Sequence, residues 1–423
     1  MQINSMLEKL KDALDYAQEN SRFYRDLFEE YSIDLTSFSP DSFERIPFTQ
    51  KSDLTARNQD FLAIEESSVF DITTTSGTTG DPISFYLSRN DVNRLATNEA
   101  GSLSLAGASN EDRFQLMTTM NRQFMAGLAY YEGIKKLGAG IVRTGPGSLK
   151  SQWEAILKYK PTYLIAIPSF IPSLIAEAKK LNINYQQTSV KAIVCIGEPI
   201  RTPELQPNTL HKRITDNWEV QLYSTYASTE MSTAYTECFA QNGCHEQSEL
   251  IYTEVVDEEG NQVQEGESGE VVVTTLGVEA MPLIRYKTGD ICHVYRTACS
   301  CKRTSLRLGP VIGRKDHRIK YKGTTLYPRS LQNFLTHENI WPYVITILTD
   351  HEGNDLVELL CDLNTDQTKL LDAFKQNFSV TPQIKKVSSD KINHLIYGKN
   401  LRKPQLVIDA RSNQKAKDLI SNL

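Results

Sequence analysis

The sequence lacks any long uninterrupted apolar run, and no stretch reaches the roughly 18 residues that a membrane-spanning helix needs. The longest candidate, residues 163–178, is interrupted by Pro168 and Pro172. The N-terminal segment is charged and amphipathic and lacks the apolar centre of a signal peptide. We therefore expect a cytoplasmic protein that does not associate with membranes.

Cysteine and excess positive charge are also scarce. None of the 7 cysteines precedes Cys195, so the sequence does not predict a disulfide framework. The 46 Lys and Arg residues are outnumbered by 52 Asp and Glu residues, which gives a net charge of −6. That balance excludes a broadly basic surface, and nucleic acid is not an expected partner. A chain of 423 residues with 40% hydrophobic residues predicts two or three globular domains.

Between residues 111 and 200, short apolar segments alternate with amphipathic helical segments. This alternation predicts βαβ units and therefore a large N-terminal α/β domain with a parallel sheet. Residues 219–226 predict a further strand, followed by a helix whose first turn holds Glu230. The segment from about residue 317 carries two helical and several strand patterns, which predict a small C-terminal α+β domain.

Two polar segments of the N-terminal region could bind a nucleotide. The segment TTTSGTTGDP (73–82) offers backbone and hydroxyl donors for phosphate oxygens, although it lacks the lysine of a Walker loop. In YSTYASTE (223–230), Tyr226 could pack on a ring, and Glu230 could bind Mg²⁺. Each segment also has a plain structural interpretation, an exposed loop for the first and an acidic residue at a helix start for the second.

Three later segments add further candidates. Asp290 follows a Thr-Gly pair in PLIRYKTGDI, where a carboxylate could accept hydrogen bonds from ribose hydroxyls. Arg314 in GRKDHRIKYKG offers a guanidinium fork for phosphate or ribose oxygens, and Lys399 in YGKNLRK offers a mobile charge for phosphate. A turn aspartate and a solvated basic face are the corresponding structural alternatives.

Taken together and in this order, the five segments resemble the adenylate-forming superfamily and, within it, the phenylacetate–coenzyme A ligase family. FMAGLAYYEGIKKLGAGIVRTGPGS, IPSF and IGEPI are also similar to that family, so the resemblance covers nearly the whole chain. It implies that ATP activates an aryl or arylacetic acid as an acyl-adenylate, which coenzyme A then converts to a thioester with release of AMP. The alternatives are an enzyme that loads an acyl carrier protein and a non-catalytic nucleotide-binding relative.

The resemblance also implies roles for single residues. Lys399 would stabilise charge during adenylation, Arg314 would lie near the ribose and α-phosphate, and Glu230 with Thr79 would bind Mg²⁺. The implied ATP- or AMP-binding set is Ser76, Gly77, Thr78, Thr79, Gly80, Tyr226, Ala227, Ser228, Thr229, Asp290 and Arg314.

The acid pocket and a domain movement follow from the same resemblance. The implied pocket residues are Phe124, Gly127, Glu198 and Tyr226. Asp316 would be the hinge between an N-terminal domain (1–314) and a mobile C-terminal domain (315–423). Gly323 would lie on the face that admits coenzyme A. The family resemblance further suggests a homodimer.

A cluster of cysteines and one histidine predicts a metal site. Cys238, Cys244 and His245 lie in ECFAQNGCHEQ, and Cys299 and Cys301 lie in ACSCKR. Thiolates and an imidazole make a good tetrahedral Zn²⁺ site, although unrelated buried cysteines would give the same pattern. Relatives with a similar segment select Cys238, His245, Cys299 and Cys301, which would form a closed structural site. The expected ligands of the protein are thus ATP, Mg²⁺, coenzyme A, a small carboxylic acid and structural Zn²⁺.

Overall fold

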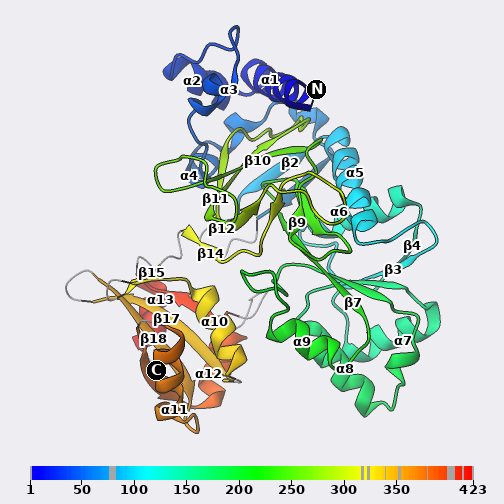
Figure 1. Cartoon of the computed structure of the whole chain (residues 1–423), viewed down its shortest axis with the longest axis vertical. Helices are drawn as coiled ribbons and strands as arrows, with labels where there is room; N and C mark the ends of the chain where they lie inside the picture. The colour runs from blue at the N-terminus through cyan, green and yellow to red at the C-terminus, as the bar shows by residue number, and fades with distance from the viewer. Residues whose placement is uncertain are drawn as a thin grey trace. The chain divides into compact units, whose positions relative to one another are not determined.

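The computed structural model describes residues 2–75, 82–315, 319–321, 324–338, 340–350, 354–378, 380–397, 405–411 and 414–421. The chain divides into two compact units, Met1–Val311 and Ile312–Leu423 (Figure 1). The sequence placed the corresponding boundary between residues 314 and 315. Among the described residues, no helix is both long and apolar enough to cross a membrane.

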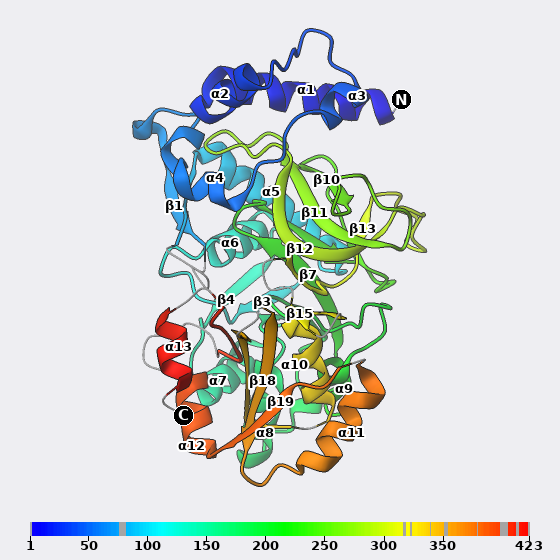
Figure 2. The same ribbon diagram turned by 90° about the vertical axis from the view of Figure 1, so that its left-hand side faces the viewer.

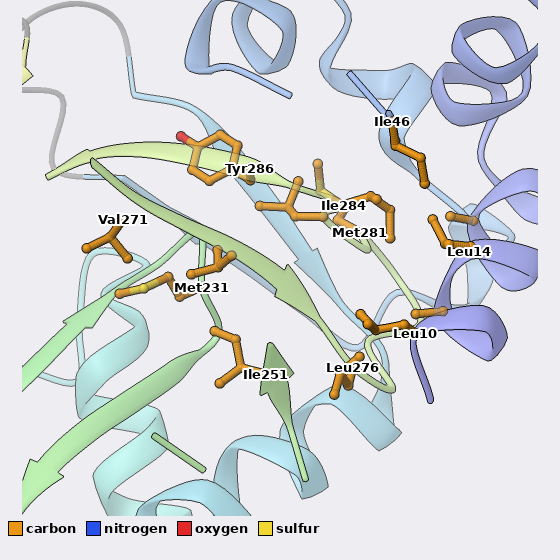
Figure 3. Close-up of a cluster of buried hydrophobic side chains, with 14 of the residues drawn as sticks. Leu10, Leu14, Ile46, Met231, Ile251, Val271, Leu276, Met281, Ile284 and Tyr286 are labelled. Carbon is orange, nitrogen blue, oxygen red and sulfur yellow. The ribbon is translucent and has the colours of Figure 1, made fainter. Parts of the chain in front are cut away.

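The first unit opens with helices that pack on the edge of a sheet. Figure 2 shows α1, α2 and α3 together beside β10 and β11. Leu10 and Leu14 of α1 belong to the same buried cluster as Met281 and Ile284, and Figure 3 shows these side chains facing one another. The elements up to the first hairpin are α1 Gln2–Asn20, α2 Arg22–Glu30, α3 Pro40–Glu44, α4 Lys51–Ala56, β1 Asp71–Thr74 and β2 Ser84–Leu87.

A parallel half-sheet follows, as the alternation between residues 111 and 200 predicts. Strands β4, β3, β5, β6 and β7 run parallel in that order; the large apolar side chains of β3, β5, β6 and β7 are almost completely buried, and those of the edge strand β4 are partly buried. Buried parallel strands need cover on both faces, and the helices between them supply it. The elements are α5 Arg89–Leu105, β3 Arg113–Leu116, α6 Met125–Leu137, β4 Gly140–Arg143, α7 Leu149–Tyr159, β5 Tyr163–Ala166, α8 Phe170–Lys180, β6 Ala192–Cys195, α9 Thr209–Thr215 and β7 Gln221–Ser228.

The sheet changes direction at β7. This strand is parallel to β6 and antiparallel to β8, and the order continues through β9, β13, β12 and β11 to β10. Strands β10 and β11 form an antiparallel hairpin around residues 257–261. The elements are β8 Thr233–Glu237, β9 Cys244–His245, β10 Ile251–Val256, β11 Ser268–Thr275, β12 Tyr286–Tyr295 and β13 Arg307–Leu308.

The predicted helix after β7 is wrong. Residues 229–232 form a turn, and the next residues form β8, which pairs with β7 from Ser228↔Thr233 to Thr225↔Thr236. All five residues of β8 are buried, and three of them are threonine or tyrosine, which favour strands. Cross-strand pairing and burial therefore override the helix-start pattern of Ser-Thr-Glu, and Glu230 lies in a hairpin turn.

A buried ion pair ties the N-terminal segment to this antiparallel half. Arg285 donates from Nη2 and Nε to the two carboxylate oxygens of Glu254, at 2.8 and 3.1 Å. Its Nη1 also donates to the carbonyl oxygen of Ile46 at 2.7 Å. Both charged side chains are almost fully buried, so each depends on the other for compensation of its charge.

The second unit is a small α+β fold, as expected. Its four-stranded sheet has the order β19, β18, β17, β20, and side chains alternate along β17. Tyr343, Ile345 and Ile347 face the cluster formed with α10 and α11, whereas Val344 faces the cluster formed with α12 and α13. Four helices are described where the sequence predicted two, because α12 and α13 have only 8 residues each.

The bounds of the second unit are as follows. The strands are β14 Gly313–Arg314, β15 Ile319–Tyr321, β16 Thr324–Leu326, β17 Tyr343–Thr349, β18 Asp355–Asp362, β19 Gln383–Val387 and β20 Val407–Asp409. The helices are α10 Pro328–His337, α11 Gln367–Asn377, α12 Ser389–Ile396 and α13 Gln414–Ser421.

One buried acid sits where α5 packs against α6. A Cβ added at Gly133 of α6 would lie 2.2 Å from Cβ of Glu99, so only glycine allows this approach. Glu99 is 5% exposed, and its Oε2 has no hydrogen-bond partner among the described residues. Burial raises the pKa of Glu99 from 4.5 to about 8.

We expect Glu99 to make folding less favourable as pH rises from 4.5 to about 8. In that window the unfolded chain releases the proton while the folded chain keeps it, so the free energy of unfolding falls with pH. Glu99→Gln removes this titration, so the variant should gain stability relative to the parent as pH rises, up to about pH 8. Urea unfolding at several pH values measures it, with exposed Glu66→Gln as control, and a pH-independent difference would contradict the assignment.

Candidate functional site

Tyr226 and Asp290, two of the predicted nucleotide-binding residues, meet in the first unit. The Tyr226 hydroxyl lies 3.0 Å from Oδ2 of Asp290, and the side chains are 8% and 4% exposed. Burial, and then the charge of Asp290, raise the pKa of Tyr226 well above its usual value. The phenol therefore stays protonated and donates, and the carboxylate accepts.

The backbone conformation just before Asp290 allows its carboxylate to point into the site. Gly289 has φ +76°, a left-handed conformation that glycine adopts without the strain of a side chain. The Asp290 N–H donates to Oγ1 of Thr288 at 3.1 Å within β12, where the pairing with β11 shifts register in a bulge, so the turn aspartate expected as the structural alternative is not found. A carboxylate fixed by one phenol keeps further lone pairs for hydroxyl donors, which is the chemistry that a ribose requires.

The end of β7 and the turn after it carry the remaining residues of this segment. Ala227 is exposed, and Ser228, Thr229 and Glu230 are partly exposed. The segments after the C-terminal ends of parallel β3, β6 and β7 lie at the same edge of the sheet. Ligands of open α/β sheets bind at this edge, so the turn is placed where a nucleotide would be expected.

Two of the predicted pocket residues lie at the start of α6. Phe124 precedes the first residue of α6 and is partly buried. A Cβ on Gly127 would lie 2.1 Å from the carbonyl oxygen of Thr119 and 2.9 Å from Cα of Met120. Because both neighbours are backbone atoms, Gly127 is required for the close approach of α6 to this loop.

The third pocket candidate, Glu198, has contacts that suit a structural role. Its carboxylate accepts hydrogen bonds from the backbone N–H and the hydroxyl of Ser169, both at 3.1 Å. Ser169 immediately precedes α8, so Glu198 binds at the positive end of that helix. Ser169 lies in the IPSF segment, which the sequence matched without assigning it a role.

Several predicted residues cannot be placed. Asp316, Gly323, Lys399 and the phosphate-loop residues 76–80 lie outside the described residues. At the base of that loop, Thr75 exchanges hydrogen bonds with Ile83, whose N–H donates to Oγ1 of Thr75 at 3.0 Å. Arg314 is described on β14 with an exposed side chain.

The four predicted metal ligands come together. The ligand atoms of Cys238, His245, Cys299 and Cys301 all lie within 4.8 Å of one another. Cys238 Sγ is 3.8 Å from Cys299 Sγ, and Cys301 Sγ is 3.5 Å from Nε2 of His245. Cys244 is separate, because its thiol faces the carbonyl oxygen of Ser224 at 3.5 Å.

Strand pairing produces this cluster from distant segments. His245 of β9 pairs with Thr236 of β8 on one side and with Arg307 of β13 on the other. Cys238 follows β8 directly, and the segment with Cys299 and Cys301 leads into β13. Three neighbouring strands therefore bring the four side chains to one place.

The chemistry of the cluster fits a closed tetrahedral metal site. Nδ1 of His245 lies 2.9 Å from the Ser305 hydroxyl, an unpredicted partner that leaves Nε2 directed at the cysteines. Burial, and then the charge of Arg307, lower the pKa of His245 to about 4, so the imidazole is neutral. Burial raises the pKa of Cys238 to about 12. Three sulfurs and one neutral nitrogen are a donor set typical of structural Zn²⁺.

A cavity of about 650 Å³ opens elsewhere in the first unit. Its lining includes Lys191, which precedes β6, and Gln221, which begins β7. These residues lie at the N-terminal ends of the parallel strands, so this cavity is not part of the site around Asp290.

Comparisons with known proteins identify relatives of this chain. Residues 16–280 match the family described as AMP-binding enzyme. The phenylacetate-coenzyme A ligase of Thermus thermophilus is 31% identical over 335 residues, which cover 78% of this chain and 74% of that protein. The Escherichia coli enzyme of the same name is 28% identical, over 79% of this chain and 76% of that protein.

A solved structure shares the fold over almost the whole chain. It is 2-hydroxyisobutyryl-CoA ligase in the postadenylation state, in complex with R3-HIB-AMP. The TM-score is 0.82 at 23% identity, and the match covers 99% of this chain and 92% of that chain.

We expect Tyr226→Phe to lower the free energy of unfolding by about 1.5–3 kcal/mol, the range for hydrogen bonds to charged groups. The loss arises because buried Asp290 loses its phenol donor. Tyr235→Phe is the matched control, since the Tyr235 hydroxyl contacts neutral Oγ1 of Thr253 at 2.7 Å. Its loss should be about 1 kcal/mol. Urea unfolding measures both, and equal losses would argue against a charged partner for Tyr226.

Proposed function

This chain belongs to the AMP-binding enzyme family, and we propose that it joins an aryl or arylacetic acid to coenzyme A. It is an AMP-forming acid–CoA ligase that works through an acyl-adenylate. The observation that carries this conclusion is its similarity to phenylacetate-coenzyme A ligases over more than three quarters of its length. The buried Tyr226–Asp290 pair supports it, because it supplies a fixed carboxylate for the ribose of ATP.

The reaction has two steps. A carboxylate oxygen of the acid attacks the α-phosphorus of ATP, and the bond to the β-phosphate oxygen breaks, releasing pyrophosphate. The thiol sulfur of coenzyme A then attacks the acyl carbon, and AMP leaves with the electron pair of the acyl–oxygen bond. The protein contributes mainly by orienting the reactants and stabilising the developing charge.

In this proposal the loop residues 76–80 bind the β- and γ-phosphates. Asp290 binds the ribose hydroxyls, and Arg314 binds near the ribose and α-phosphate. Mg²⁺ would neutralise phosphate charge when bound, and Thr79 and Glu230 are its proposed protein ligands. Lys399 stabilises the charge that develops at the α-phosphate during the first step.

The acid pocket and the second step involve other residues. Phe124, Gly127 and Tyr226 are the proposed contacts of the acid, and Glu198 acts on the pocket through Ser169 and α8. The second unit moves about Asp316 between the two steps, and Gly323 lies on the face used by coenzyme A. A homodimer and a cytoplasmic location remain predictions from the sequence.

The function is tested by measuring AMP formation from ATP over a panel of acids, with and without coenzyme A. The panel contains phenylacetate, hydroxyphenylacetates, benzoates, indole-acetate, cinnamates and medium-chain fatty acids. Strong AMP formation with a ring acid only in the presence of coenzyme A is the expected result. Turnover that requires an acyl carrier protein instead would overturn the proposed acceptor, and turnover confined to fatty acids would overturn the proposed acid class.

Lys399→Ala should abolish acyl-adenylate formation but leave thioester formation from a supplied acyl-adenylate intact. The reason is that the ammonium group is needed only while the carboxylate attacks the α-phosphate. The two half-reactions are assayed separately, by pyrophosphate release and by thioester formation. Lys391→Ala on α12 is the matched control at an exposed position, and it should affect neither step. Equal loss in both steps would contradict the role of Lys399.

We propose that Cys238, His245, Cys299 and Cys301 bind one structural Zn²⁺ ion. Protein purified without chelators should contain about one zinc per chain, because four protein ligands leave no exchangeable position. Cys301→Ser should lose most of the metal and lower Tm, whereas Cys244→Ser should keep the metal. Metal analysis by mass spectrometry decides between them, and a zinc content far below one per chain would refute the site.

A further inference from the structure

Helix α5 carries a buried polar stripe whose partners lie on β8 and on the loops beside the ends of β8, β10 and β11. Arg94, Asn98 and Ser102 are spaced four residues apart and therefore lie on one face of the helix. Their exposures are 7%, 0% and 2%. Burying polar groups in a core costs free energy unless each group is hydrogen-bonded. The bonding partners of these three side chains therefore show what the stripe supports.

The side-chain amide of Asn98 forms hydrogen bonds with the backbone of β8, in the way that a neighbouring strand would. Its Oδ1 accepts the Ala234 N–H at 2.8 Å, and its Nδ2 donates to the Ala234 carbonyl oxygen at 3.2 Å. Strand β9 pairs only with Thr236 and Glu237, so Ala234 lies beyond the end of β9. The side-chain amide thus satisfies the backbone of β8 where the next strand has stopped.

Arg94 holds the residues just before Ala234. Its Nη1 donates to the Ser232 carbonyl oxygen at 2.6 Å, and its Nη2 lies 3.2 Å from Oγ1 of Thr233. The same guanidinium donates to the carbonyl oxygens of Leu276, at 2.7 Å from Nε, and of Leu250. Burial lowers the pKa of Arg94 to about 10, which leaves the group charged at neutral pH.

The turn between β7 and β8 has weak bonds of its own. The Ser232 N–H donates to the Thr229 carbonyl oxygen, and the Met231 N–H to the Ser228 hydroxyl, both at 3.3 Å. Ser232 also has φ +48°, a strained conformation for a residue with a side chain. The Thr233 hydroxyl donates to the Met231 carbonyl oxygen at 3.0 Å, and the bonds from α5 add to this restraint from outside the turn.

We propose that Arg94 and Asn98 are positioning residues that set the Thr229–Ser232 turn and, through it, the carboxylate of Glu230. This inference rests on the proposed role of Glu230 in the first step of the reaction. Neither side chain contacts the reactants. Their effect should appear in the step that uses ATP with Mg²⁺ and not in the step that uses coenzyme A.

The test uses isosteric variants of two fully buried amides. Asn98→Leu removes both bonds to β8. Gln115→Met is the matched control, because Gln115 on β3 is equally buried and bonds to Gln152 of α7 at 2.7 Å. The measurements are pyrophosphate release as a function of Mg²⁺ at saturating ATP, thioester formation from a supplied acyl-adenylate, and Tm.

We expect Asn98→Leu to raise the KM for Mg²⁺ by about 10- to 100-fold, as losses of residues that support metal ligands do. Thioester formation from the supplied acyl-adenylate should stay near the parent rate. Arg94→Lys keeps the positive charge but loses the forked donors of the guanidinium group. It should likewise impair pyrophosphate release more than thioester formation. Gln115→Met should lower Tm without impairing one half-reaction more than the other.

Glu230→Gln tests the proposed role of Glu230 separately from the positioning role of Arg94 and Asn98. If Glu230→Gln weakens the response to Mg²⁺ but Asn98→Leu and Arg94→Lys do not, the positioning role is overturned and the role of Glu230 stands. If Glu230→Gln has no effect on pyrophosphate release, the assignment of Glu230 itself fails. If Asn98→Leu lowers the rates of both half-reactions equally, Asn98 has a purely structural role.

Discussion

The hydrogen bond between Tyr226 and Asp290 constrains the rest of the large unit. Tyr226 belongs to β7 and Asp290 to β12, and three strands, β8, β9 and β13, separate these two in the order of the sheet. Adjacent strands lie roughly 4.8 Å apart, so a flat sheet could not bring the two side chains to 3.0 Å. The antiparallel half must therefore curl until β12 faces β7, and the Tyr226 phenol then donates to the buried carboxylate of Asp290.

Strand β8 lies next to β7 in this curl and connects the Glu230 turn with the cysteine–histidine cluster. The turn that precedes it carries Glu230, and Cys238 follows its last residue. At its beginning, β8 is held by Arg94 and Asn98 of α5, and at its end by β9 and the cysteine–histidine cluster. Its pairing with β7 fixes the register of this strand of 5 residues. The cysteine–histidine cluster therefore lies at one end of the strand and the turn that carries Glu230 lies at the other.

The sequence predicts a structural element well when the contacts that stabilise the element come from residues close to it in the chain. The parallel strands between residues 111 and 200 were predicted because each is a short apolar run between amphipathic helices. The helix expected after β7 was wrong because pairing with β7 and burial override the local pattern, and further bonds to β8 come from Asn98, 136 residues earlier in the chain. For the same reason, proximity of Tyr226 and Asp290 was not readable from their separate motifs. The roles of the phosphate loop and Lys399 remain predictions, because those residues lie outside the described parts of the chain.

Motifs identify the residues that touch a substrate better than those that hold them in place. Glu198 matches a family segment, yet its contacts are with the first turn of α8. Arg94 and Asn98 match no motif, yet they supply the bonds that the Glu230 turn lacks. Charged and amide side chains are rarely buried unless their partners repay the lost hydration. In α5 the polar side chains at a spacing of four therefore mark the face that bonds β8 where its pairing with β9 has ended.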